Sequence, residues 1–142
     1  MLYVDTSALV ALYVKEANSE SASDLIRSNN EAIPKTMLHE LEFTNAIQLK
    51  RFRHEMTEDE AGTIFKRFNA HEMAGVYFRP QIDWPDVFSH TLTLSSRHTM
   101  ATGSRSLDIL HVALAQIIEA DRFFTFDGKQ SELARAAGLN VV

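Results

Sequence analysis

The chain has 142 residues, of which 45% are hydrophobic and 23% charged, a composition typical of one globular domain spanning residues 1–142. It contains no cysteine, which excludes a disulfide scaffold, a thiolate metal site and a cysteine nucleophile. No apolar run approaches the roughly 18 residues of a membrane span, and residues 1–5 lack the pattern of a signal peptide. We therefore expect a cytoplasmic protein without membrane association. The net charge of −5 neither supports nor excludes a nucleic-acid partner.

The first part of the chain alternates short apolar runs with helical segments. The apolar residues before Asp5 predict a buried strand, and Thr36 offers a cap for a long helix. The predicted elements are, in order, a strand at 2–5, helices at 8–14 and 19–28, a strand at 32–34 and a helix from Thr36 to about 53.

The second part continues this alternation. Thr57 and Glu60 have the spacing of a capping box, and Gly103 indicates a loop. The predicted elements are a helix to about 74, a strand at 76–81, a helix at 86–98, a loop at 99–105, a helix at 107–120 capped by Ser106, a strand at 122–126, a helix at 130–137 ended by Gly138, and a strand at 139–142. Strands that alternate with helices predict an α/β fold with a mainly parallel sheet.

Four acidic residues occupy comparable places in this pattern. Asp5 and Asp127 each follow the end of a predicted strand, and the carboxyl ends of parallel strands share one edge of a sheet. Glu40 and Asp108 lie in the first turns of predicted helices, which begin at that same edge. The topology therefore brings all four carboxylates near one edge.

Carboxylates gathered in this way repel one another, by about 1 kcal/mol for a pair ~4 Å apart in water and by several times more within a protein. A cation, or raised pKa values, would have to compensate. A set of oxygen ligands without cysteine favours Mg²⁺ or Mn²⁺. Such an ion polarises a phosphoryl oxygen and lowers the pKa of an attacking water, which suits hydrolysis of a phosphodiester.

The four acids lie within short segments that follow one another along the whole chain. The segments are Asp5-Thr6-Ser7-Ala8-Leu9, Leu38-His39-Glu40-Leu41, Arg105-Ser106-Leu107-Asp108-Ile109-Leu110-His111-Val112-Ala113 and Phe124-Thr125-Phe126-Asp127. In order and spacing they resemble the four acidic motifs of PIN-domain nucleases, and most closely those of the VapC-type toxins of toxin–antitoxin pairs.

This resemblance implies an α/β/α sandwich with a five-stranded parallel sheet and a metal-dependent endoribonuclease activity. It implies that Asp5 and Asp108 are the main ligands of Mg²⁺ or Mn²⁺, and that Glu40 and Asp127 complete the catalytic acidic pocket. It also implies a homodimer that acts on RNA and is silenced by a VapB-type antitoxin.

Several polar neighbours of the acids are candidates for contact with RNA. By the same resemblance, Thr6, Ser7 and Thr125 are expected to hydrogen-bond the carboxylates or the scissile phosphate. Arg105 precedes Asp108 at the mouth of the predicted site, where its guanidinium would bind a phosphate in a bidentate manner or pair with an acid. Both roles of Arg105 stay open.

The second acid has an alternative in Glu42. Glu40 and Glu42 point about 200° apart on a helix, so only one of them should face the site. The match to the family motif favours Glu40, whereas periodicity alone does not decide between them. His111 lies one turn after Asp108, and we expect a packed or hydrogen-bonded structural role for it rather than a role as ligand.

Each acid also has a purely structural interpretation. Asp5 is a possible helix cap, Asp108 a first-turn acid favoured by the helix dipole, Glu40 an exposed helix residue and Asp127 part of a turn. The metal site is favoured because all four fall at one edge. Two rival functions remain: a catalytically silent PIN-like module that binds RNA or protein, and a phosphatase with Asp5 as nucleophile. The phosphatase pattern expects a second aspartate at position 7, where this chain has Ser7.

Overall fold

The computed structural model describes residues 1–142, and the chain forms two compact units. One unit contains residues 1–5 and 80–142, and the other contains residues 6–79. Both units combine helices with a pair of parallel strands. The predicted α/β class with parallel strands is therefore confirmed.

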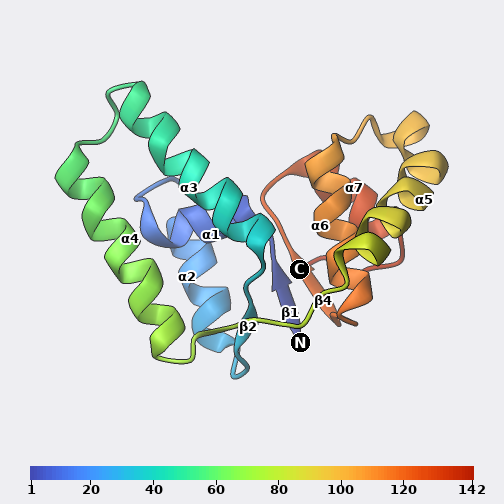
Figure 1. Ribbon diagram of the computed structural model, residues 1–142, viewed down its shortest axis with the longest axis horizontal. Helices are drawn as coiled ribbons and strands as arrows, with labels where there is room; N and C mark the ends of the chain where they lie inside the picture. Colours follow the sequence, from blue (N-terminus) through green and yellow to red (C-terminus); the bar gives the residue numbers. More distant parts are fainter. The chain divides into compact units, whose positions relative to one another are not determined.

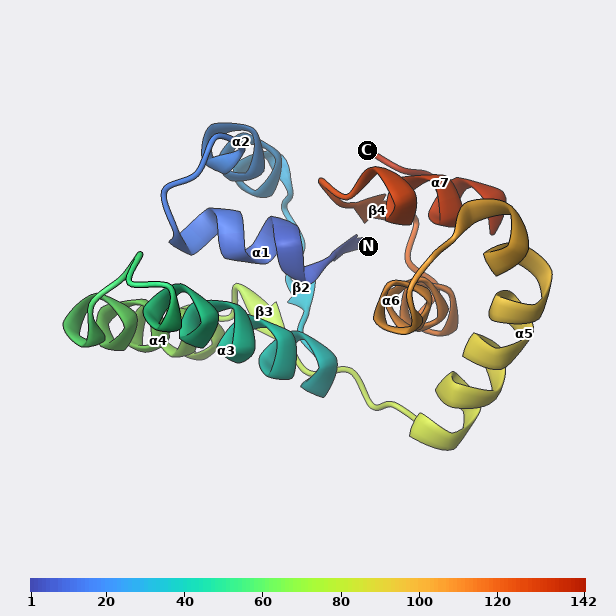
Figure 2. The same ribbon diagram turned by 90° about the horizontal axis from the view of Figure 1, so that it is seen from above.

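In the first unit, two strands pair in parallel, and three helices pack against one another beside them (Figure 1). The register places Tyr3 opposite Phe123, and the two rings stack with centroids 5.4 Å apart. Helix α6 packs against both α5 and α7 (Figure 2), and its residues 108–115 are all buried. The elements are β1 (Leu2–Val4), α5 (Trp84–Thr102), α6 (Ser106–Ile117), β4 (Arg122–Phe124) and α7 (Gly128–Ala136).

In the second unit, four helices accompany a shorter pair of parallel strands. Helices α3 and α4 pack together as a hairpin (Figure 1), and the rings of Phe43 and Phe68 stack between them at a centroid distance of 4.1 Å. Tyr13 packs edge-on against both rings. The elements are α1 (Thr6–Tyr13), α2 (Ser19–Ser28), β2 (Ile33–Pro34), α3 (Met37–Phe52), α4 (Glu58–Met73) and β3 (Tyr77–Phe78).

The helix starts follow the predicted caps closely. Thr57 and Glu60 form the expected capping box, in which the Thr57 hydroxyl accepts from the Glu60 amide and the Glu60 carboxylate accepts from the Thr57 amide. Helix α3 begins after Thr36 as predicted. At α6, however, the N-cap is Arg105 rather than the predicted Ser106.

The helix ends differ more from the predictions. Helix α5 continues through the predicted loop to Thr102, because the first residue with a left-handed backbone is Gly103, at φ 62°. Helix α6 ends earlier than predicted, at Ile117. Glu119 takes a left-handed φ of 56°, and the amide of Ala120 donates to the carbonyl of Ala115. Such an end usually carries glycine, so a glutamate there gives no sequence signal. Gly138 follows α7 with a positive φ, as expected of a helix end.

The strands are shorter than predicted, and the five-stranded sheet is only partly present. Four strands form two pairs, and the segment 139–142 contributes one bridge between Phe123 and Val141. None of the seven helices is both long and apolar enough to cross a lipid bilayer.

The end of α5 gives a test of the backbone argument. A Cβ at residue 103 would meet no atom within 4 Å, so Gly103→Ala tests only the left-handed conformation. We expect it to lower the free energy of unfolding by about 1–2 kcal/mol. Gly62→Ala, within α4 and equally uncrowded, is the matched control and should raise the free energy of unfolding by about 0.5–1 kcal/mol. Urea unfolding of both variants measures the two changes, and equal effects would contradict the explanation.

Candidate active site

The first unit brings Asp5, Asp108 and Asp127 together through short connections at the ends of its strands. Asp5 directly follows β1, and its backbone amide donates to the carbonyl of Phe124 at 2.9 Å, which continues the pairing of β1 with β4. Asp5 is 3% exposed. The parallel register therefore fixes the position of Asp5 relative to the residues that follow β4.

Thr125 connects two of these acids. Its hydroxyl oxygen lies 2.8 Å from a carboxylate oxygen of Asp5, accepts from the Asp127 amide at 2.9 Å, and lies 2.9 Å from the side-chain oxygen of Gln130. A hydroxyl has one proton, and we assign it to the Asp5 carboxylate because hydrogen bonds to charged acceptors are the stronger ones. Thr125 thus orients the Asp5 carboxylate.

Asp108 and Asp127 both have helix-capping bonds. One oxygen of Asp127 accepts from the Gln130 amide at the start of α7, and Asp108 accepts from the Arg105 amide at the start of α6. Both acids therefore stabilise a helix start, as their structural interpretation predicts. Helix capping does not explain why a cation lies between the two carboxylates.

That cation is the guanidinium of Arg105. Its Nε lies 3.0 Å from one oxygen of Asp108, and a terminal nitrogen lies 3.3 Å from the other oxygen of Asp108 and 3.4 Å from Asp127. Of the two roles left open for Arg105, the structure contains the pairing with acids. The Arg105 side chain is 75% exposed and that of Asp108 only 13%, so the arginine covers the acids from the solvent side.

Glu40 belongs to a different cluster, in the second unit. Its carboxylate pairs with Arg79 and lies 3.4 Å from the Lys35 ammonium, and both cations also pair with Glu72. Lys35 is 1% exposed and lies 4.1 Å from the centre of the Phe68 ring. Arg79 and Lys35 hold the pKa of the Glu40 and Glu72 carboxyls below their usual range, mainly through the hydrogen bonds from Arg79.

Glu42, the alternative second acid, has a different partner. The Thr6 hydroxyl donates to a Glu42 carboxylate oxygen at 2.8 Å. Thr6 directly follows Asp5 in the chain and is the first residue of α1. Ser7 is exposed at the start of α1. His111 is buried and hydrogen-bonded to the Tyr3 hydroxyl at 2.7 Å, as expected for a structural histidine.

Sequence reasoning missed the partners of the acids more often than the acids themselves. Gln130 had a signal, because Asp127 and Gln130 have capping-box spacing. Lys35, Glu72 and Arg79 had none, since their cluster joins two segments, around residues 35–40 and 72–79, that lie far apart in the sequence. No group of three or more histidine, aspartate or glutamate side chains is arranged to hold a metal ion.

Comparison with known proteins assigns the family. The family model described as the PIN domain matches residues 2–136 and so runs through both units. The chain belongs to the PIN domain family. No curated protein matches this PIN-domain chain.

Two solved structures share the fold of this PIN domain. VapC20 of Mycobacterium tuberculosis, described as a sarcin–ricin loop cleaving toxin, is 19% identical with a TM-score of 0.71, over 98% of this chain and 96% of that one. FitAcB of Neisseria gonorrhoeae is 15% identical with a TM-score of 0.70, over 99% of this chain and 96% of that one. At these identities the likeness establishes the fold.

The ion pairs of the second unit make its stability depend on pH. Since the folded-state pKa values of Glu40 and Glu72 are lowered, their contribution is complete above the usual value of 4.5 and is lost as the pH falls through the folded-state values. Arg79→Gln should therefore cost about 1 kcal/mol at pH 7, the size typical of a half-exposed ion pair, and progressively less below pH 4.5. Urea unfolding at pH 7 and at pH 3 measures the loss.

The control for this prediction is Arg97→Gln, which removes an exposed arginine from α5. It should change stability equally little at both pH values. A cost of Arg79→Gln that is the same at pH 3 as at pH 7 would contradict the assignment of the two carboxylates.

Proposed function

We propose that this PIN domain is a metal-dependent endoribonuclease of the VapC type. The observation that carries the proposal is the pairing of Asp108 and Asp127 with one guanidinium, beside the buried carboxylate of Asp5. One guanidinium neutralises only one of these charges, so the acids keep a net negative charge that favours a divalent cation. The family and the description of VapC20 as a sarcin–ricin loop cleaving toxin support the same activity.

The chemistry of the donor set fits Mg²⁺ or Mn²⁺. The three aspartates offer only carboxylate oxygens as metal ligands, the ligand type that these ions prefer. When bound, such an ion would polarise a phosphoryl oxygen and lower the pKa of the attacking water. Asp5, Asp108 and Asp127 would hold it. Because these acids are not grouped as a ligand set around one point, their side chains would have to turn toward the ion, and Arg105 would have to leave its place between two of them.

Arg105 would then have a second use. Released from Asp108 and Asp127, its exposed guanidinium can bind a phosphate of the RNA in the bidentate manner that arginine favours. Thr125 would keep the Asp5 carboxylate oriented through its hydroxyl. Thr6 and Ser7, at the start of α1, remain predicted contacts of the carboxylates or the substrate.

For the fourth acid, we favour Glu42 over the motif-based choice of Glu40. Glu40 belongs to a cluster in which two acids pair with two cations, whereas Asp108 and Asp127 share one cation and keep a net negative charge. The Glu42 carboxylate instead accepts a hydrogen bond from Thr6, the residue that follows Asp5. This assignment is tested separately from the activity itself.

The partners in this proposal are RNA, a VapB-type antitoxin and a second copy of the chain. The antitoxin and the homodimer rest on the resemblance to VapC toxins. The rival proposal is a PIN-like module that binds RNA or protein without cutting. The two proposals differ in the effect of a divalent metal on RNA: the nuclease requires the metal to cleave, whereas a silent module would have no metal-dependent effect.

The activity is tested by incubating total cellular RNA with the protein in Mg²⁺, in Mn²⁺ and in EDTA. We expect discrete fragments with either metal and none in EDTA, because the metal supplies the activated water. Asp5→Asn and Asp108→Asn should each reduce cleavage by at least about a hundredfold, the size expected when a group acting in the transition state is lost. Full metal-dependent cleavage by both variants would overturn the proposed site, and cleavage that persists in EDTA would overturn the metal.

The fourth acid is tested with a matched pair of variants. Glu42→Gln should lower kcat at least about tenfold, since it removes a charge from the proposed pocket. Glu40→Gln removes the same charge two residues away and should leave kcat within a factor of about two, with a small loss of stability from its ion pairs. The reverse pattern would restore Glu40 as the second acid.

A further inference from the structure

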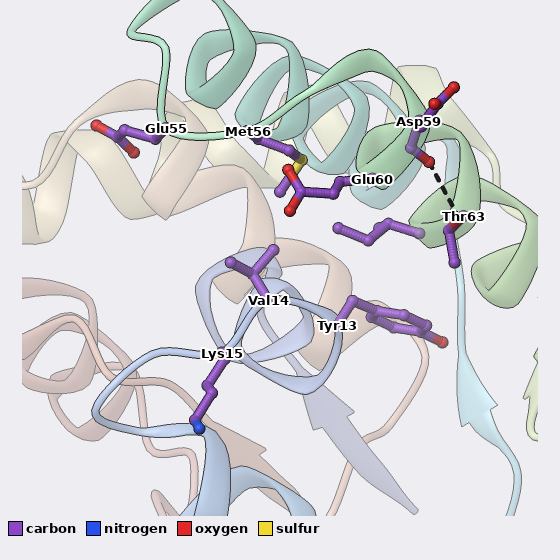
Figure 3. Close-up of a pocket in the computed structure, with 9 residues that line it drawn as sticks. Tyr13, Val14, Lys15, Glu55, Met56, Asp59, Glu60 and Thr63 are labelled. Carbon is purple, nitrogen blue, oxygen red and sulfur yellow. Dashed lines mark hydrogen bonds between the residues drawn. The ribbon is translucent and has the colours of Figure 1, made fainter.

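Two cavities of the second unit differ sharply in charge. The first, with a volume of about 510 Å³, lies between the end of α1 and the start of α4 (Figure 3). Glu55, Asp59 and Glu60 line it, against a single cation, Lys15. The excess of negative charge in this first cavity would repel an anion.

The second cavity, with a volume of about 350 Å³, contains no acidic side chain. It is lined by apolar side chains and by six polar ones from α1, α2, α4 and β3: Tyr13, Ser23, Arg27, Arg67, His71 and Tyr77. Its volume is at the small end of the range for ligand pockets, about 300–1,000 Å³. A small anionic group therefore suits it in both size and charge.

Its two arginines have no acidic partner. Neither Arg27 nor Arg67 takes part in an ion pair of the structure, although four of the other seven lysine and arginine residues of this unit do. Arg67 is held above the Tyr13 ring, with its guanidinium carbon 5.7 Å from the ring centre, within the range of a cation–π contact. Glu72, the acid next to His71 on α4, is already paired with Lys35 and Arg79.

One wall of the cavity contains linked hydrogen-bonding side chains. The Tyr13 hydroxyl lies 2.7 Å from Nδ1 of His71 and 2.8 Å from the Tyr77 hydroxyl. Burial raises the pKa of both Tyr77, to about 12, and Tyr13, so both hydroxyls keep their protons. If Tyr13 donates to Nδ1 of His71 and accepts from Tyr77, both hydroxyl protons are used within this group, and Nε2 of His71 is the donor that is left for a ligand. The wall therefore offers one donor and no anionic side chain.

We propose that this cavity, which we name the arginine pocket, binds a phosphate group. Two guanidinium groups provide the planar donor pairs that phosphate oxygens accept, and the His71 imidazole and Ser23 hydroxyl add single donors. None of these residues belongs to the acidic motifs, so the proposal stands whether or not the protein is a nuclease. The phosphate group has two possible sources, the backbone of an RNA strand and a small phosphorylated molecule.

The test begins with calorimetric titration of the full chain with inorganic phosphate. We expect saturable binding to the wild-type protein, weakened at least about tenfold by either Arg27→Gln or Arg67→Gln, since each removes charge-assisted hydrogen bonds. Lys66→Gln is the matched control, because it removes an exposed positive charge from the residue before Arg67. It should leave the affinity unchanged.

A second arm distinguishes the two sources. Binding of a 12-nucleotide single-stranded RNA is measured by fluorescence anisotropy at several salt concentrations, in EDTA so that metal-dependent cleavage cannot occur. If RNA is the source, each arginine variant should weaken RNA binding and reduce the salt dependence by about one ion, while Lys66→Gln does so less. If phosphate binds but RNA affinity is unchanged in the arginine variants, the pocket takes a small phosphorylated molecule.

The proposal is overturned by either of two results. One is an absence of saturable phosphate binding to the wild-type protein. The other is equal phosphate affinity in wild-type protein and in the Arg27→Gln/Arg67→Gln double variant. Both arginines are exposed, so the variants should fold, and an unchanged urea unfolding curve checks this.

Discussion

Charge balance at buried ionisable side chains is the constraint on which both units depend. A charge removed from water needs an opposite charge or several hydrogen bonds, since an unpaired buried charge is costly. In the first unit Thr125 supplies a donor to Asp5, and Arg105 supplies a cation to Asp108 and Asp127. In the second unit, Glu40 and Glu72 balance the buried ammonium of Lys35 and the half-exposed guanidinium of Arg79. Each unit thus neutralises its acids with its own side chains, and these partners decide which acids remain accessible to an external cation.

The elements that carry strong local signals could be predicted from the sequence alone. The capping box at Thr57, the cap at Thr36 and the apolar residues of β1 have local physical causes, and the structure contains all three. The failures also have local causes. Helix α6 is followed by a glutamate, Glu119, with a left-handed backbone, and a glutamate does not predict a helix end as a glycine would. The predicted last strand is reduced to a bridge at Val141. Strand length depends on pairing with distant segments, so periodicity in one segment cannot fix it.

The candidate site illustrates the same limit. The motif order predicts which acids form the site, because their positions after strands and at helix starts are properties of the sequence. Their partners come from elsewhere in the chain: Arg79 reaches Glu40 across 39 positions, and Thr6 reaches Glu42 across 36. Two glutamates that periodicity could not separate are distinguished by these contacts. The family resemblance therefore narrows the chemistry, whereas the contacts distinguish residues within a motif.

The guanidinium between Asp108 and Asp127 has a consequence for how the protein folds. Many metal sites fold only when the ion arrives, because the ion supplies the missing positive charge. Here Arg105, the N-cap residue of the helix that carries Asp108, already supplies positive charge. The polypeptide can therefore reach its native state before any ion binds. If cleavage requires a metal as proposed, a chelator would stop it while leaving the protein folded, and returning the ion would restore it without any refolding step.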